Sequence, residues 1–302
     1  MTEDGRRPRL NGLKAKLDAI HRSAIVPKDL ELTEPIYDPA EFAGKTILIT
    51  GVSHFNGFGY ETVKKFIEMG AGAVAFNYRV ETDEVRAVIA DLNQRAKLTG
   101  TQVIPIQADI SKIKQAEGLV GKVVAQTGRL DVFIDNAGKI AIGLLAEQTP
   151  DQVVENAMTN VVGFQIILGE AVRQMESARA GRVVSIMSVA ADGAFRQSQY
   201  GAAKAYRFGA MRSGATEALL RRTGVTFVCV APGFSSTAMT SVIGETERPT
   251  LMRMIGQTEE VPSSEVAKYT IFAASSHLPD ELNGQVIPVY KPMKAPVALG
   301  GK

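Results

Sequence analysis

The chain has 302 residues, of which 45% are hydrophobic and 22% are charged, and its formal net charge is +2. These are ordinary values for a protein that buries a sizeable core, and so small a charge gives no support for nucleic-acid binding. One cysteine, Cys229, excludes an intrachain disulfide. No apolar run approaches the roughly 20 residues that cross a bilayer, and no His, Cys and carboxylate residues have the spacing of a metal site. With no secretory h-region in the charged N-terminus, a cytoplasmic protein without membrane contact or bound metal is expected.

The first 43 residues precede any regular alternation of elements and are predicted to form an N-terminal arm. Several prolines interrupt this segment, and Leu10, Leu13, Leu17 and Ile20 recur at helical spacing. We expect the arm to pack on its own domain or on a neighbouring subunit. The alternative is a helix that binds a membrane or a partner.

Residues 44–293 alternate short β-branched runs with longer helical stretches, which is typical of a parallel sheet covered by helices on both faces. They predict a single α/β domain with a doubly wound, seven-stranded parallel sheet. Residues 235–261 lack strand alternation and are predicted to form a lid, and residues 294–302 a C-terminal tail. The strands are predicted over residues 45–50, 73–78, 102–107, 131–135, 182–188, 225–230 and 285–290, and the helices over 59–69, 82–97, 111–127, 151–178, 198–222 and 263–275.

A glycine-rich turn over residues 50–59, TGVSHFNGFG, follows the first strand and opens the first helix. Glycines let the backbone approach the phosphates of a dinucleotide, and the helix N-terminus offers free N–H donors. A purely structural turn would also need glycine. His54 is expected to pack over a cofactor or donate to a phosphate rather than act in catalysis. The residues of this turn expected to bind a cofactor are Gly51, Ser53, Asn56, Gly57, Phe58 and Gly59.

Small or polar residues follow the carboxyl ends of the later strands, which is the edge where ligands bind in such sheets. Asp109, followed by Ile110, could reach the adenine edge of a cofactor, although a helix N-cap explains it equally well. The other strand-end residues are Asn136, Ala137 and Gly138 after the fourth strand, Ser188 at the end of the fifth, and Pro232 and Gly233 after the sixth.

Tyr200 lies four residues before Lys204, one turn earlier on the predicted helix. The cation can therefore favour the phenolate and lower the pKa of the phenol, which would make Tyr200 an acid/base near neutral pH. Alone, this spacing is common on helices. Asn160 lies within a long apolar helix, where a buried amide must be hydrogen-bonded. A local kink and a functional role explain Asn160 equally well.

In their order and spacing, these motifs resemble the short-chain dehydrogenase/reductase family from about residue 44 to about residue 292. The resemblance implies a Rossmann fold, a nicotinamide cofactor and hydride transfer between a carbonyl and an alcohol. It implies that Tyr200 is the general acid in reduction and the base in the reverse direction. Lys204 would hold the nicotinamide ribose and lower the pKa of Tyr200, Ser188 would bond the carbonyl oxygen, and Asn160 would hold a water linked to Lys204. Because relatives form dimers and tetramers, a homodimer or homotetramer is expected.

The glycine turn departs from the family, because five residues separate Gly51 from Gly57 where members usually have three. This lengthened turn is similar to that of the enoyl-acyl-carrier reductases and of some ketoreductase modules. The enoyl enzymes place the tyrosine seven positions before the lysine, and that position here is Gln197. A ketone substrate is therefore favoured over an enoyl thioester.

Cofactor preference in the family depends on the residue at the end of the second strand. NAD-preferring relatives carry an Asp at the place of Tyr78, and here Arg79 follows, which leaves a cation for a 2′-phosphate. We predict NADP(H) over NAD(H); the alternative is that Arg79 is a solvated loop cation. The resemblance adds Thr237, downstream of the Pro-Gly turn, to the cofactor contacts.

The substrate is expected to be a medium-sized hydrophobic ketone or secondary alcohol, with an acyl or aromatic group. An enoyl-thioester reductase is one alternative function. Another is a non-catalytic protein that senses NADP(H), although the intact Ser188, Tyr200 and Lys204 argue against it. The apolar residues expected to line the substrate pocket, each of which could equally be a core residue, are Ile140, Ile142, Phe195, Phe234, Met239 and Met252.

Overall fold

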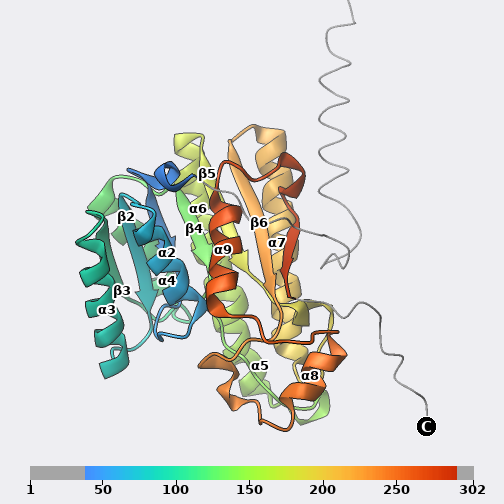
Figure 1. Cartoon of the computed structure of the whole chain (residues 1–302). Helices are drawn as coiled ribbons and strands as arrows, with labels where there is room; N and C mark the ends of the chain where they lie inside the picture. The colour runs from blue at the N-terminus through green and yellow to red at the C-terminus, as the bar shows by residue number, and fades with distance from the viewer. Residues whose placement is uncertain (1–37, 291–302) are drawn as a thin grey trace, which may run out of the picture.

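The computed structural model describes residues 38–290, so most of the predicted arm and the whole C-terminal tail lie outside the described residues. Seven parallel strands form one sheet in the order β3-β2-β1-β4-β5-β6-β7 (Figure 1). The sheet therefore reverses its direction of winding between β1 and β4, which is where such sheets bind ligands. The strands are β1 (Thr46–Ile49), β2 (Ala73–Tyr78), β3 (Gln102–Gln107), β4 (Val132–Asp135), β5 (Gly181–Ile186), β6 (Val225–Pro232) and β7 (Val286–Val289).

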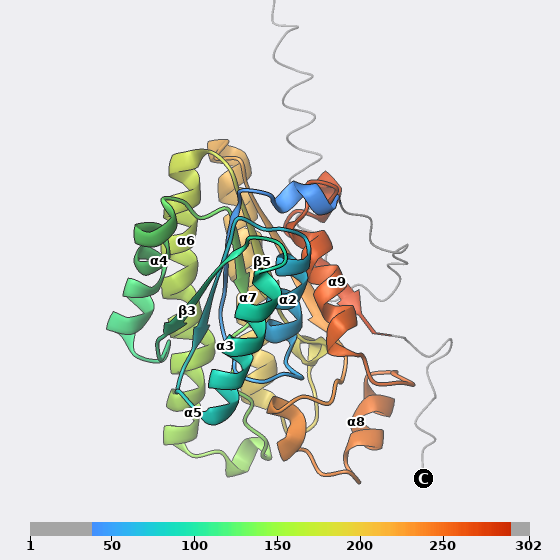
Figure 2. The same ribbon diagram turned by 60° about the vertical axis from the view of Figure 1, so that its left-hand side comes forward.

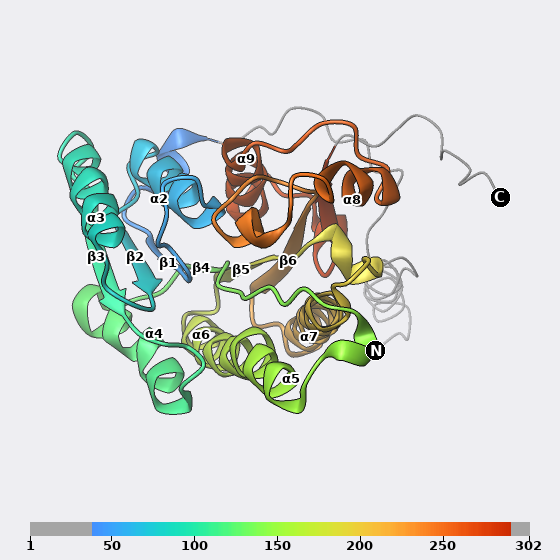
Figure 3. The ribbon, with the colours of Figure 1, turned by 90° about the horizontal axis from the view of Figure 1, so that it is seen from below.

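Helices cover both faces of this sheet, with α2, α3 and α9 on one side and α4, α6 and α7 on the other (Figure 3). The doubly wound parallel sheet predicted from the sequence is confirmed. The helices are α2 (Phe58–Glu68), α3 (Asp83–Ala96), α4 (Ile113–Thr127), α5 (Pro150–Ala157), α6 (Phe164–Ala178), α7 (Ser198–Arg221), α8 (Arg248–Met254) and α9 (Ser263–Ala274).

The central strands are apolar along their whole length because both of their faces are covered. In β1, Leu48 packs into the core on the side of α4, α6 and α7, whereas Ile47 and Ile49 pack on the side of α2, α3 and α9. All three side chains are completely buried. Burial of each side chain contributes roughly 1.5–3 kcal/mol, and the alternation fixes which face of the sheet each side chain packs against.

The last residues of the predicted arm pack into the domain rather than away from it. A short 3-10 helix, Pro39–Phe42, begins at Asp38, whose carboxylate accepts a hydrogen bond from the amide of Ala40 at 2.8 Å. Phe42 is fully buried, and its ring lies 5.0 Å from that of Phe66 in an edge-to-face contact. The core therefore begins a few residues before the predicted boundary.

The long helix predicted over residues 151–178 is one continuous helical rod with a defect in its middle. A π-helical segment, Met158–Gly163, lies between α5 and α6. At Gly163 a Cβ atom would lie 2.2 Å from the carbonyl oxygen of Ile110. The close approach of this backbone carbonyl is therefore possible only because residue 163 is glycine.

The other predicted boundaries differ from the structure by one or two residues, and the difference matters at Ser188. The fifth strand ends at Ile186, not at Ser188. Ser188 instead caps a 3-10 helix, Val189–Asp192, because its hydroxyl accepts a hydrogen bond from the amide of Ala190 at 3.1 Å. A serine favours a cap over a strand end for this reason.

The predicted lid contains a short 3-10 helix, Met239–Val242, and helix α8. Figures 1 and 2 show α8 beyond the lower end of the sheet, toward which the strands point. Gln257 joins this segment to the end of β6, because its buried amide accepts from the backbone N–H of Phe234 at 2.6 Å and donates to the carbonyl of Phe234 at 2.8 Å.

Candidate active site

The glycine-rich turn connects β1 to α2 and leaves no room for a side chain at Gly51 or at Gly59. Gly51 has a φ of +74°, and a Cβ atom there would lie 2.6 Å from the Cα of Ala137. A Cβ atom at Gly59 would lie 2.7 Å from the side-chain nitrogen of Asn136. Gly57 is the N-cap of helix α2, so no side-chain hydrogen bond caps the start of this helix. Its first N–H groups are therefore available to an anionic group such as a phosphate.

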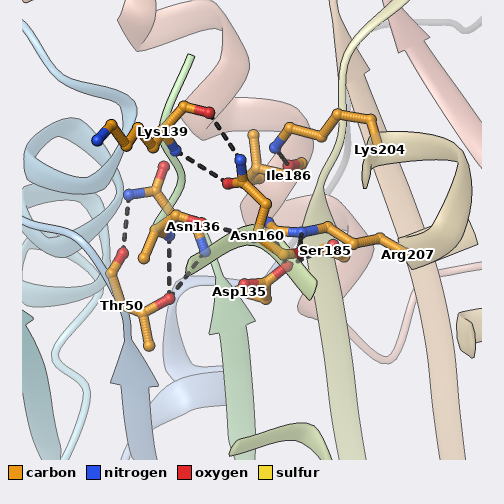
Figure 4. A network of polar contacts seen from close by, with 10 residues as sticks. Thr50, Asp135, Asn136, Lys139, Asn160, Ser185, Ile186, Lys204 and Arg207 are labelled. Atoms are coloured by element: carbon orange, nitrogen blue, oxygen red, sulfur yellow. Dashed lines mark hydrogen bonds and ion pairs between the residues drawn. The ribbon is translucent and has the colours of Figure 1, made fainter. Parts of the chain in front are cut away.

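The turn is tied to the residues that follow β4 (Figure 4). The hydroxyl of Thr50 accepts from the amides of Asn136 and Ala137 at 3.1 and 3.0 Å. The side chain of Asn136 donates in return to the carbonyls of Thr50 and Gly51 at 2.8 and 2.9 Å. These reciprocal bonds hold the two backbone segments that would lie under a dinucleotide.

Asn77 braces the same turn, and sequence reasoning did not identify it. Its buried side chain accepts from the amide of Gly51 at 3.2 Å and donates to the carbonyl of Ala108 at 2.7 Å. A signal was present, because Asn77 is the one amide side chain in a strand of alanine, valine and aromatic residues. An amide buried in such a strand needs partners, and here the turn supplies them.

A cavity of about 480 Å³ extends from this turn to Tyr200 and Lys204. Asn56 and Tyr78 lie outside its walls; the carbonyl of Asn56 accepts from the hydroxyl of Ser263 at 2.7 Å, and Tyr78 is buried. The predicted site residues that line the cavity are Gly51, Ser53, Gly57, Phe58, Gly59, Arg79, Asp109, Ile110, Asn136, Ala137, Gly138, Tyr200, Lys204 and Thr237.

Asp109 lies on the wall of this cavity and also makes the turn that leads toward α4. One carboxylate oxygen accepts from the amide of Ser111 at 3.0 Å and from its hydroxyl at 2.7 Å. Partial burial raises the pKa of Asp109, but the bonds from Ser111 and the charges of Arg79 and Lys112 outweigh this, so the pKa is lowered. Asp109 is not the N-cap of α4, because that position is Lys112, so the N-cap interpretation is wrong and the contact with a cofactor stays a prediction.

His54 occupies the lengthened part of the turn and contacts the start of α3. Its Nδ1 lies 2.8 Å from a carboxylate oxygen of Glu84, and both side chains are about half exposed. The imidazole also lines the large cavity. Within the described residues, no hydrogen bond or ion pair joins His54 to Tyr200, Ser188 or Lys204; its polar partner is Glu84.

A second cavity, of about 140 Å³, adjoins Ser188 and Tyr200. Its walls are mainly apolar, and Pro232 and Gly233 contribute to them. Of the predicted lining residues, Ile140, Phe195, Phe234 and Met239 line this cavity.

Two predicted lining residues, Ile142 and Met252, lie outside these walls. From α8 the cavity is lined by Leu251 and by Ile255, which directly follows the helix. Residues four apart share one face of a helix, so residue 252 points in another direction. The prediction for Met252 was therefore wrong because the orientation of α8 could not be deduced from its composition.

Tyr200 and Lys204 lie one turn apart on α7. The ammonium nitrogen of Lys204 lies 5.5 Å from the centroid of the Tyr200 ring and donates to the carbonyl of Ile186 at 2.6 Å (Figure 4). Burial raises the pKa of Tyr200, and the charge of Arg207 and a hydrogen bond with Ser188 only partly oppose it.

Lys204 is not among the groups that shift the pKa of Tyr200, so the lowering expected from Lys204 stays a prediction. Burial, followed by repulsion from Arg207, lowers the pKa of Lys204 well below its ordinary value. A lysine whose charged form is disfavoured cannot stabilise a phenolate strongly. Among the described residues the cation that opposes the raised pKa of Tyr200 is Arg207.

Asn160 lies in the π-helical segment. The local helix irregularity expected at Asn160 is therefore present, and it lies beside the candidate site. Its side-chain oxygen accepts from the amide of Lys139 at 2.9 Å, and its side-chain nitrogen donates to the carbonyl of Lys139 at 2.7 Å (Figure 4). It also donates to Asn156 at 3.0 Å. π-helical turns are frequent at functional sites. In this one, the side chain of Asn160 holds the backbone of Lys139, the residue after Gly138, by two hydrogen bonds.

Sequence reasoning also missed Asp135 and Arg207, which form a completely buried ion pair behind the site. The guanidinium Nη1 lies 2.7 Å from a carboxylate oxygen of Asp135. An aspartate at the end of an apolar strand and an arginine one turn after Lys204 were visible in the sequence. Their proximity required the fold, because 72 residues separate them.

Among residues 38–290, no three His, Cys, Asp or Glu side chains gather in a way that could hold a metal ion. No helix in the same range combines the length and the hydropathy of a membrane span.

The fold and these motifs place the chain in a known family. Residues 45–248 match the family model described as short chain dehydrogenase. The chain belongs to the short-chain dehydrogenase/reductase family, and it is an oxidoreductase that acts on carbonyl and alcohol groups with a nicotinamide dinucleotide.

The chain is 30% identical over 249 residues to the 3-oxoacyl-[acyl-carrier-protein] reductase FabG of Staphylococcus aureus, with 81% of this chain and 96% of the relative covered. It is 30% identical over 208 residues to a subunit of (2S)-[(R)-hydroxy(phenyl)methyl]succinyl-CoA dehydrogenase from Thauera aromatica, with 69% and 80% covered. Among solved structures, a short chain dehydrogenase from Burkholderia cenocepacia in complex with NADP aligns with a TM-score of 0.71, at 26% identity, over 83% of this chain and 98% of the other.

Proposed function

We propose that this protein reduces a hydrophobic ketone to a secondary alcohol with NADPH, and that Tyr200 donates the proton. The carrying observation is that two cavities adjoin each other and that Tyr200 is among the residues that line both. Tyr200 lines both the 480 Å³ cavity, which begins at the glycine turn, and the smaller apolar cavity at Ser188. A cofactor and a substrate could therefore reach the same hydroxyl from two sides.

The large cavity fits a dinucleotide. Gly51 and Gly59 leave no space for a Cβ atom, so the backbone of the turn itself forms the wall, and the uncapped start of α2 offers N–H donors. Asp109, Ile110 and the residues 136–138 would contact the remainder of the cofactor. When bound there, the nicotinamide supplies the hydride for the carbonyl carbon.

The protein supplies the proton and stabilises the charge on the oxygen. As the carbonyl carbon gains a hydride, its oxygen gains negative charge, and the hydroxyls of Ser188 and Tyr200 can both donate to that oxygen. Tyr200 then transfers its proton and the alcohol forms. Because burial raises the pKa of Tyr200, the phenol holds its proton at neutral pH, which suits the direction of reduction.

The substrate cavity favours apolar chains or rings. Phe195, Phe234 and Ile243 line it, and 3-oxoacyl thioesters combine a ketone with an apolar chain. A 3-oxoacyl thioester is therefore the first substrate class to test, with aromatic ketones second. An enoyl thioester is the alternative, and its reduction would not need a tyrosine at position 200.

Because Cys229 is buried and has no disulfide partner in the chain, we expect the protein in the reducing cytoplasm.

Replacement of the tyrosine tests the proposal directly. Tyr200→Phe removes the proton donor and should lower kcat for ketone reduction at least about 100-fold, measured as NADPH oxidation with 3-oxoacyl thioesters and aryl ketones. The matched control is Tyr206→Phe on the same helix, whose hydroxyl donates to Gln165 at 3.1 Å on the surface; it should retain full activity. Full activity of Tyr200→Phe would exclude Tyr200 as the acid.

A further inference from the structure

Arg207 is completely buried on α7, three residues after Lys204. Its guanidinium donates to the carboxylate of Asp135 at 2.7 Å, to the carbonyl of Ala137 at 2.8 Å and to the carbonyl of Asn160 at 3.0 Å (Figure 4). It therefore joins α7 to the end of β4, to the turn that follows this strand and to the π-helical segment.

The guanidinium is held from other sides as well. Its carbon lies 4.9 Å from the centroid of the Phe164 ring, which gives a cation–π contact. The oxygen of Asp135 that accepts from Arg207 also accepts from the hydroxyl of Ser185 at 2.7 Å. A planar guanidinium with five N–H donors can satisfy such a set of oxygens at once, whereas an ammonium cannot.

Stability alone gives a poor explanation for this buried pair. Both ions lose their hydration, and apolar residues of similar volume often hold a core as well or better. An apolar pair, however, could not hold two backbone carbonyls in fixed positions. The buried ion pair therefore supplies something that apolar packing cannot, namely directed hydrogen bonds to the carbonyls of Ala137 and Asn160.

These two carbonyls belong to backbone segments beside the candidate site: Ala137 lines the large cavity, and the side chain of Asn160 bonds to the backbone of Lys139, which lines it too. Ala137 precedes Gly138, where a Cβ atom would lie 3.2 Å from the side-chain oxygen of Asn160 and 3.9 Å from the ammonium nitrogen of Lys204. Asn160 in turn binds the backbone of Lys139. The segment 137–139 is thus held by Arg207 at its first residue and by Asn160 at its last.

We propose that Arg207, with Asp135, is a positioning residue for hydride transfer, which holds the segment 137–139 and the π-helical turn at Asn160 together beneath Tyr200 and Lys204. The inference rests on the function proposed above and names a residue that acts through these groups without touching the substrate. It also explains why an ion pair is buried beside the site.

The charge of Arg207 has a separate, measurable effect. Burial and Arg207 together lower the pKa of Lys204, which Asp135 and Cys229 oppose, and Arg207 lowers the pKa of Tyr200 against the effect of burial. Loss of the cation should therefore raise the pKa of Tyr200. The pH above which reduction slows would then move upward, which a loss of packing alone would not cause.

Two variants separate the geometry from the charge. In the double variant Asp135→Leu/Arg207→Met, the melting temperature should stay within about 3 °C of the unmodified protein. Its kcat should fall about 10- to 100-fold, its Kd for NADPH should rise about tenfold in a fluorescence titration, and the alkaline limb of its pH profile should move upward. Arg207→Lys keeps the charge but loses the fork of donors, so kcat should fall while the alkaline limb stays in place.

The control is Arg212→Met, because Arg212 lies on the same helix and stacks 4.9 Å above the ring of Phe208; kcat and Kd should not change. A double variant with normal kcat and normal Kd would overturn the inference, as would full rescue of kcat by Arg207→Lys. If the double variant does not fold, the kcat of Arg207→Lys tests the inference in its place. Full activity of Tyr200→Phe would instead reject the proposed function. In that case the Kd of the double variant for NADPH would still show whether Arg207 positions the segment 137–139.

Discussion

Tyr200, Ser188 and Lys204 acquire their chemistry from burial as much as from their identity. The phenol is surrounded by protein, and the nearest opposing influences on its raised pKa are Arg207 and Ser188. A buried phenol that keeps its proton can donate it to a developing alkoxide. At the scale of the residue, the raised pKa of Tyr200 supports the proposed reduction at neutral pH.

The raised pKa of Tyr200 predicts the pH dependence of ketone reduction. An acid must be protonated to act, so activity should persist as long as the pH is below the pKa of Tyr200, which lies above the ordinary value of 10.0. The value of kcat/KM for the ketone should thus stay nearly constant between about pH 7 and 9. A pH series at saturating NADPH measures this. A decline centred near neutral pH would show instead that the pKa of Tyr200 is lowered.

Arg79 is expected to set the cofactor preference. It is exposed, it lines the large cavity, and within the described residues it has no carboxylate at ion-pair distance. Arg79→Gln should lower kcat/KM for NADPH about tenfold, because one charge-assisted contact with the 2′-phosphate is lost, and should leave that for NADH nearly unchanged. Measurement of kcat/KM with NADPH and with NADH, for the variant and for the unmodified protein, tests this prediction.

The control for this variant is Arg86→Gln, because Arg86 pairs with Glu81 and Asp83 outside the cavity walls. Equal or better efficiency of the unmodified protein with NADH would refute the assignment of NADP(H).

At the scale of the element, the π-helical segment Met158–Gly163 shows how one glycine permits a local geometry. The backbone of Gly163 lies directly against the carbonyl of Ile110, on the wall of the cofactor cavity. The extra residue in the helix turns Asn160 toward Lys139. The defect therefore connects α5 and α6 to the ligand edge of the sheet.

Replacing this glycine should destabilise the fold. The Cβ atom of Gly163→Ala would lie 2.2 Å from a backbone oxygen, so the helix or the Ile110 loop must shift. The free energy of unfolding should fall by roughly 1–3 kcal/mol, measured by urea denaturation. The control, Gly121→Ala in α4, has no atom within 4 Å of its Cβ and should gain about 0.5–1 kcal/mol. If Gly163→Ala left the free energy of unfolding unchanged, the backbone around Gly163 and Ile110 could move apart at little cost, which would contradict this prediction.

At the scale of the whole molecule, α6 and α7 lie side by side on one face of the sheet (Figure 3). A surface hollow between them is lined by small residues of both helices, Gly169, Gly209, Ala210 and Gly214, whereas Ala215, the next small residue on α7, is completely buried. Only part of the small-residue pattern on α7 is therefore available to a second copy of the chain.

We expect these two helices to form the contact of a homodimer or homotetramer. Multi-angle light scattering at micromolar concentration should give at least twice the mass of 32.4 kDa. Gly209→Glu places a charge in the hollow, where the Cβ atom meets nothing within 4 Å inside one chain, so the assembly should dissociate while the monomer stays folded. A monomeric unmodified protein would contradict the expectation.

The order of elements, the parallel sheet and the glycine turn could be predicted from the sequence, because hydrophobic periodicity and turn residues act locally. The same is true of Tyr200 and Lys204, which are one helical turn apart. The end of the fifth strand and the π-helical segment could not be predicted, because they depend on the cap at Ser188 and on the approach of Ile110 to Gly163.

The sequence by itself determined the family and the reaction class, since both depend on short motifs and on the order of these motifs along the chain. Only the tertiary structure decided the state of the groups at the ligand edge. The pKa of Tyr200 and the partners of Asn160 depend on burial and on Arg207, which packing brings to Asp135 from 72 residues away. Burial and long-range contact are properties of the folded core, so the short spacing of Tyr200 and Lys204 could not reveal them.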